Sequence, residues 1–143
     1  MIASVLLADE AESARTQLDQ FLSTHLIDVD SVGSATECIR RLRERRYDAL
    51  ILGVELKWGG AEGVLAVLNE EPALSNIPVI LTSSIIGDSE LATFVKWPVV
   101  HSLSKPFSPT ALLQRILDAT RSSRSRQSPY NESLRPPSSA LGR

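Results

Sequence analysis

Short apolar runs alternate with amphipathic stretches along most of this chain of 143 residues. The apolar runs are short and rich in Val, Ile and Leu, which is typical of β-strands. They comprise Ser4–Ala8, Val29–Val32, Ala49–Leu52, Val79–Thr82 and Val99–Leu103. The intervening stretches repeat apolar residues at helical spacing. They comprise Glu12–Ser23, Ala35–Arg46, Gly63–Asn69, Ser89–Lys96 and Ala111–Thr120.

This alternation predicts an α/β fold with a doubly wound, five-stranded parallel sheet and helices on both faces. Runs such as Leu50–Leu52 suit strands that are covered on both sides. Strict strand–helix alternation requires crossover connections, which are expected to be right-handed. Two local signals support the helix boundaries. Ser34 and Glu37 form a capping box, and Ser108 precedes Pro109 as an N-cap before a proline at the first helical position.

The composition fits one globular domain, with 43% hydrophobic and 22% charged residues. Cys38 is the single cysteine, so the sequence predicts neither an intrachain disulfide nor a cysteine-based metal site. On its helix, Cys38 is expected to act as a small buried hydrophobe. The sequence has no apolar run near the ~20 residues of a membrane span and no basic, leader-like start. These features predict a soluble cytoplasmic protein without membrane association.

The net charge of −2 hides a division between two regions. After Thr120 the chain has five arginines and one acid, a balance of +4, whereas residues 1–120 carry −6. Ser, Arg and Pro dominate the later segment, which has too few apolar groups to offset the entropy of ordering it. We therefore expect a domain over residues 1–120 and a flexible basic tail over 121–143.

Four of the predicted strands are followed by residues of possible functional interest. They lie at the carboxyl ends of the strands, where ligands bind in an open α/β sheet. Asp9-Glu10 follow the first strand, Gly53 the third, Ser83 the fourth and Lys105-Pro106 the fifth. The intervals from Glu10 to 53, from 53 to Ser83 and from Ser83 to Lys105 are 43, 30 and 22 residues. This set, spread over residues 2–120, resembles a response-regulator receiver domain of two-component signalling. The resemblance implies a flavodoxin-like strand order of 2-1-3-4-5.

The resemblance also implies a role for each residue. Asp9 and Glu10 would form a metal-binding acid pair, while Ser83 and Lys105 would hold phosphoryl oxygens with a hydroxyl and an ammonium. The Lys105-Pro106 peptide bond would be cis. Position 53 would carry the phosphoacceptor aspartate, but here it is Gly53. Three residues before the lysine, the family's aromatic switch residue is replaced by Ser102.

Glycine can neither attack phosphorus nor ligate a metal, so the site lacks its nucleophile. Asp48 begins the same strand and would lie about 16 Å away, too far to substitute. Glu55 is nearer, although in-line attack from it would be fortuitous. Two acids and one lysine leave a formal charge of −1, and Lys105 can neutralise an acid directly. We expect at most weak Mg²⁺ binding at Asp9 and Glu10, and no other cofactor.

The sequence thus favours a degenerate receiver that is not an enzyme and acts as a phosphorylation-independent protein-interaction module. Its partner would be a histidine kinase, an output protein or another regulator, and a homodimer is left open. By resemblance, the contact surface would include Phe94, Trp97, Leu103, Leu112 and Arg115.

Two alternatives remain at this point. One is a nucleic-acid-associated regulator that uses the arginine-rich segment Arg40–Arg46 and the basic tail, although the charge of −6 on the domain opposes it. The other is an active phosphorelay member modified at Glu55 or at a tail serine, namely Ser122, Ser123, Ser125 or Ser128.

Overall fold

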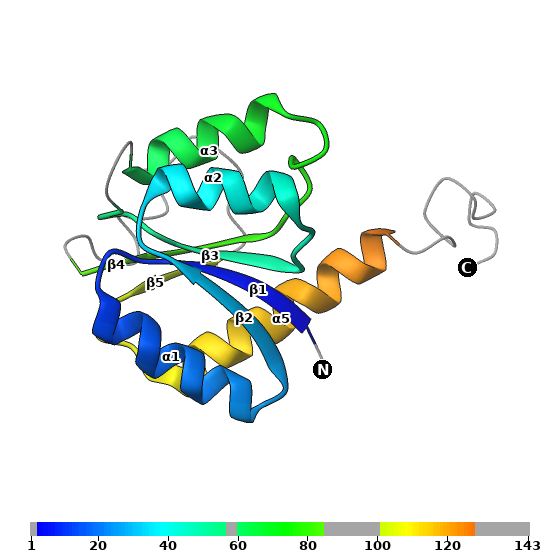
Figure 1. Ribbon diagram of the computed structural model, residues 1–143. Helices are drawn as coiled ribbons and strands as arrows, with labels where there is room; N and C mark the ends of the chain where they lie inside the picture. Colours follow the sequence, from blue (N-terminus) through cyan, green and yellow to red (C-terminus); the bar gives the residue numbers. More distant parts are fainter. Residues whose placement is uncertain (1–2, 57–59, 85–100, 128–143) are drawn as a thin grey trace, which may run out of the picture.

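A computed structural model describes residues 3–56, 60–84 and 101–127 of the chain (Figure 1). Five parallel strands form one sheet in the order β2-β1-β3-β4-β5, as predicted. The strands are β1 (Ala3–Ala8), β2 (Ile27–Val32), β3 (Ala49–Gly53), β4 (Val79–Ser83) and β5 (His101–Ser104). The helices among the described residues are α1 (Glu12–Thr24), α2 (Ala35–Glu44), α3 (Gly60–Glu70) and α5 (Pro109–Gln127).

Helices cover both faces of the sheet: α2 and α3 lie on one face, and α1 and α5 on the other (Figure 1). Successive strand residues point to opposite faces, so each strand supplies both halves of the core. Leu50 and Leu52 pack on the α2–α3 side, whereas Ala49 and Ile51 pack on the α1–α5 side. Each fully buried leucine or isoleucine contributes roughly 1.5–3 kcal/mol through the hydrophobic effect.

The predicted capping interactions are confirmed. The hydroxyl of Ser34 accepts a hydrogen bond from the Glu37 backbone N–H at 3.2 Å, and the Glu37 carboxylate accepts one from the Gly33 N–H at 3.4 Å. At the start of α5, the Ser108 hydroxyl accepts from the Ala111 N–H at 3.0 Å. Cys38 is fully buried, as expected, and burial raises the pKa of its thiol to about 12.

Two predicted helix boundaries differ from the structure by three residues or more. Helix α3 begins at Gly60 rather than Gly63, and Gly60 has a φ of +67°, which glycine adopts without a Cβ penalty. Helix α5 continues past the predicted end at Thr120 to Gln127, because each added residue gains a hydrogen bond once a helix has formed. The first part of the predicted tail is therefore helical.

Other sequence predictions fall outside the described residues. These are the predicted helix Ser89–Lys96, the beginning of the predicted strand Val99–Leu103, and tail residues 128–143. Within the described ranges, no helix combines the length and apolar character needed to cross a membrane.

Candidate functional site

Four strand ends meet at one edge of the sheet, where the polar residues of the sequence pattern lie. Ala8 is in register with Leu52, Gly53 with Thr82, and Ser83 with Ser104. The Lys105 N–H donates to the Ser83 carbonyl at 2.7 Å, which brings the ends of β4 and β5 together. The parallel sheet therefore gathers Asp9, Gly53, Ser83 and Lys105 as the sequence predicted.

Asp9 is the most enclosed charged group at this edge. Its side chain is only 6% exposed, and its Oδ2 atom lies 2.6 Å from the Nζ atom of Lys105, whose side chain is 24% exposed. Its Oδ1 atom accepts from the Ala11 N–H at 2.8 Å. The Arg15 guanidinium donates to the Asp9 carbonyl at 2.6 Å. Both carboxylate oxygens of Asp9 are thus engaged within the chain.

Position 53 faces directly into this acid site. A Cβ atom built on Gly53 would lie 3.6 Å from Asp9 Oδ2 and 3.3 Å from the Ala8 carbonyl oxygen. The second contact is tight enough to require a shift of a few tenths of an ångström. Gly53 is a regular strand residue without a positive φ, so its backbone conformation does not require glycine. The backbone at position 53 would therefore also accept a residue with a side chain, once the contact with Ala8 relaxed.

Glu55 makes a contact that the sequence reasoning missed. Its Oε2 atom accepts from the Ser83 hydroxyl at 2.7 Å and from the Ser84 backbone N–H at 3.1 Å. A tight turn after β3, closed by a hydrogen bond of 3.2 Å from the Leu56 N–H to the Gly53 carbonyl, places Glu55 there. The sequence offered one signal for this contact, namely an acid two residues after Gly53.

Comparison with known proteins identifies the family. The model of the response regulator receiver domain matches residues 5–117. The chain belongs to the receiver domain family. Members of this family interact with histidine kinases and other signalling proteins, and they are generally signalling modules rather than enzymes.

Individual relatives agree with this assignment. The chain is 27% identical over 118 residues to the regulatory protein VirG of Agrobacterium tumefaciens, covering 82% of this chain and 43% of that protein. It is 26% identical over 116 residues to the transcriptional regulatory protein YcbL of Bacillus subtilis, which is described as uncharacterised, covering 81% and 50%. The chain thus spans half or less of the length of these curated relatives.

A solved structure confirms the fold of the receiver. The receiver domain of the Francisella response regulator 1452 superposes with a TM-score of 0.77 at 20% sequence identity, covering 85% of this chain and 98% of that one. The flavodoxin-like order 2-1-3-4-5 is therefore the receiver fold.

The residues of this receiver site do not fit the three-acid magnesium centre that the family implies. Gly53 supplies no ligand, Asp9 is already held by Lys105 and Ala11, and Glu55 is turned toward Ser83. Over the described ranges, no group of three or more His, Cys, Asp or Glu side chains is arranged to hold a metal ion. Glu10 itself is exposed beside Asp9.

The remaining site predictions have mixed outcomes. The Lys105-Pro106 bond is cis, as predicted. Ser102 is half-buried on β5, and Arg115 is half-buried on α5. Leu103 and Leu112 were predicted on the partner surface, but they are 6% and 0% exposed and belong to the core, because their side chains face the sheet interior. Phe94 and Trp97 lie outside the described residues.

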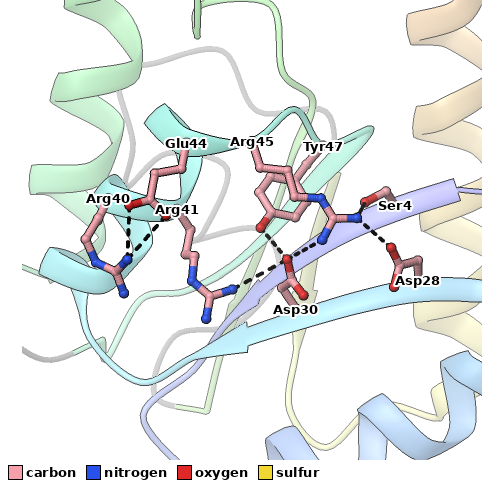
Figure 2. Close-up of polar contacts among 8 residues, drawn as sticks. All are labelled: Ser4, Asp28, Asp30, Arg40, Arg41, Glu44, Arg45 and Tyr47. Atoms are coloured by element: carbon pink, nitrogen blue, oxygen red, sulfur yellow. Dashed lines mark hydrogen bonds and ion pairs between the residues drawn. The ribbon is translucent and has the colours of Figure 1, made fainter.

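The arginine-rich segment Arg40–Arg46 forms ion pairs within the domain. We call Arg40, Arg41, Arg43 and Arg45, with their acidic partners, the α2 arginine cluster. Figure 2 shows Arg45 reaching from the end of α2 to Asp28 at 2.5 Å and Asp30 at 2.7 Å on β2. Arg41 lies 3.5 Å from Asp30. Arg40 pairs with Glu44 at 3.1 Å along the helix, and Arg43 pairs with Glu71.

Tyr47 completes the cluster. Its hydroxyl donates to Asp30 Oδ2 at 2.5 Å, and the Arg45 guanidinium lies 5.2 Å from the centre of its ring (Figure 2). Burial, followed by the hydrogen bond to Asp30, raises the pKa of the Tyr47 phenol. The tyrosine therefore remains a protonated donor at neutral pH.

Proposed function

We propose that this receiver domain signals through protein contacts and does not accept a phosphoryl group at position 53. The observation that carries the proposal is the placement of Gly53. Its missing side chain would project to within 3.6 Å of Asp9 Oδ2, where an attacking carboxylate is needed. Without a nucleophile, no bond to phosphorus can form at that position.

Neighbouring acids do not replace the missing group. Asp48 lies at the opposite end of the sheet, where its carboxylate accepts from the Ser4 N–H at 2.8 Å. Glu55 is near the site, but its Oε2 atom is engaged by Ser83 and Ser84. A nucleophile must have an available lone pair directed at the phosphorus atom, and these contacts orient the carboxylate elsewhere.

The expected loss of metal binding accompanies the loss of the acceptor. The Lys105 ammonium lies 2.6 Å from Asp9 and neutralises the negative charge of its carboxylate. That carboxylate is therefore less available as a ligand for a divalent cation. A divalent cation would have to displace this ammonium and would gain no ligand at position 53. We propose that Mg²⁺ binding is weak or absent in the native chain.

The partner class follows from the family. A receiver in the cytoplasm that lacks phosphotransfer would act by binding a histidine kinase, an output protein or a second regulator. The relatives named above are regulatory proteins of about twice the matched length.

The nucleic-acid alternative loses support from the α2 arginine cluster. Binding to phosphate backbones requires cations that gain energy by releasing counterions from the nucleic acid. Here Arg40, Arg41, Arg43 and Arg45 contact the carboxylates of Glu44, Asp30, Glu71 and Asp28. The four acids cancel the four positive charges, so the cluster presents no net positive charge to a phosphate backbone.

The proposal is tested by exposing the native chain to acetyl phosphate with Mg²⁺ and measuring its intact mass. A phosphorylatable receiver treated in the same tube serves as the positive control. We expect the control alone to gain the mass of one phosphoryl group. A stable adduct on the native chain, mapped to Glu55 or a tail serine, would support the phosphorelay alternative instead.

A further inference from the structure

Glu55 occupies a small cradle of hydrogen-bond donors at the end of β4. One of its oxygens, Oε2, receives both the Ser83 hydroxyl at 2.7 Å and the Ser84 backbone N–H at 3.1 Å. Ser83 is fully buried, Glu55 is half-buried and Ser84 is exposed, so the cradle lies at the border between the core and solvent. A hydroxyl and a main-chain N–H converging on one oxygen are suited to bind an oxyanion.

The cradle lies beside the ion pair between Lys105 and Asp9. The backbone of Lys105 is joined to that of Ser83 by a hydrogen bond of 2.7 Å, and its ammonium is held by Asp9 at 2.6 Å. The edge of the sheet therefore contains two closed contacts, Lys105 with Asp9 and Ser83–Ser84 with Glu55. Among the described residues, Lys105, Ser83 and Ser84 could each donate to a phosphoryl oxygen, and each already contacts a carboxylate of the chain.

We propose that the Glu55 carboxylate is an internal anion that fills the oxyanion position of this receiver site. The proposal rests on the proposed function, in which Gly53 has removed the phosphoacceptor. It adds that Glu55 is a second obstacle to phosphorylation, besides the missing acceptor. Restoring a carboxylate at position 53 would not by itself restore efficient phosphoryl acceptance, because the incoming group would compete with Glu55 for Ser83 and Ser84.

The chemistry of the competition is simple. In the reconstructed site, a carboxylate oxygen at position 53 attacks the phosphorus of acetyl phosphate as the bond from phosphorus to the acetyl oxygen breaks. Acetate leaves with the electron pair, and no proton or redox partner is required. The transferred group carries negative charge, so it is repelled by the Glu55 carboxylate and lacks the two donors that Glu55 retains.

The first experiment compares three variants treated with acetyl phosphate and Mg²⁺. They are Gly53→Asp, the double variant Gly53→Asp/Glu55→Ala, and a matched control, Gly53→Asp/Glu62→Ala. Glu62 is an exposed acid on α3, so its removal changes the net charge equally without touching the cradle. The rate of adduct formation is followed by intact mass.

We expect the double variant Gly53→Asp/Glu55→Ala to form the adduct about tenfold faster than Gly53→Asp. Losing one charge-assisted hydrogen bond changes an equilibrium or rate constant by roughly one order of magnitude. The Glu62→Ala control should match Gly53→Asp. Equal rates in all three variants would overturn the proposal. The native chain would still lack an acceptor in that case, so the proposed function would stand separately.

A second measurement needs neither metal nor phosphoryl transfer. In ¹H–¹⁵N NMR spectra of the chain with Gly53 retained, Glu55→Ala should move the Ser84 amide proton upfield, because its charged acceptor is gone. Glu62→Ala should leave that resonance in place, and unchanged resonances from the core would show that both variants are folded. An unmoved Ser84 amide in Glu55→Ala would refute the contact and with it the internal anion.

Discussion

The strand-end site and the α2 arginine cluster both bring opposite charges into contact, but they do so in different surroundings. At the strand ends, the Asp9 side chain is only 6% exposed and is paired with the Lys105 ammonium. In the cluster, the side chains of Arg40 and Glu44 are both 55% exposed. Similar ion-pair distances therefore correspond to different energies.

Solvent explains the difference. Water stabilises an exposed charge almost as well as an ion-pair partner does, so breaking an exposed pair costs little. A buried carboxylate has lost that solvation and depends on its protein partners. Charges counted along the sequence do not separate these cases. Three substitutions test whether burial sets the ranking.

The largest effect is expected at the strand ends. Lys105→Ala leaves the Asp9 carboxylate buried, with the Ala11 N–H as its one direct side-chain donor among the described residues. We expect the free energy of unfolding to fall by about 2 kcal/mol, measured by urea denaturation. Adding Asp9→Asn to Lys105→Ala removes the unpaired charge and should recover most of the loss. A single variant as stable as the native chain would contradict the assignment of Asp9 as a desolvated charge.

An intermediate effect is expected where the cluster is partly buried. Tyr47→Phe removes the hydrogen bond to Asp30 while keeping the ring, and it should cost about 1 kcal/mol in the same assay. The raised pKa of Tyr47 means that this contribution is present below the ordinary phenol pKa of 10.0 and is lost as pH rises through the higher folded-state value. A stability difference that grew above that pH would refute the role given to the protonated phenol.

The smallest effect is expected on the exposed face of α2. Arg40→Ala breaks the pair with Glu44, and the free energy of unfolding should change by about 0.3 kcal/mol or less. Raising the salt concentration should shrink even this difference, because exposed charges are screened. If Arg40→Ala destabilised the domain as much as Lys105→Ala, burial would not be the quantity that ranks these contacts.

Most of the fold could be predicted from the sequence because its signals are local and repeated. Apolar runs, helical spacing and the caps at Ser34 and Ser108 located the described elements, while the family resemblance supplied the strand order. The errors arose at helix ends. The third helix was predicted to begin at Gly63 rather than Gly60, and the polar composition after Thr120 concealed the continuation of α5. Local composition is a weak guide to where a helix stops.

The candidate site was predicted less completely. The spacing of Asp9, Gly53, Ser83 and Lys105 placed these residues at one edge, and the structure confirms it. Leu103 and Leu112 were assigned to the partner surface, but they are buried. The sequence position of a residue on a helix or strand does not show whether its side chain faces the sheet or solvent. The contact between Glu55 and Ser83 was also missed, because it joins residues from two different strand ends.

By itself, the sequence determined that this chain lacks a carboxylate at position 53, since that is a matter of residue identity. It also determined the succession of strands and helices, because hydrophobic periodicity is local. Only the tertiary structure decided which charges pair. It paired Asp9 with Lys105, and Glu55 with Ser83 and Ser84. It also paired Arg43 with Glu71, just after α3, and Arg45 with Asp28 of β2. These choices depend on distances across the fold and on how much water remains around each charge.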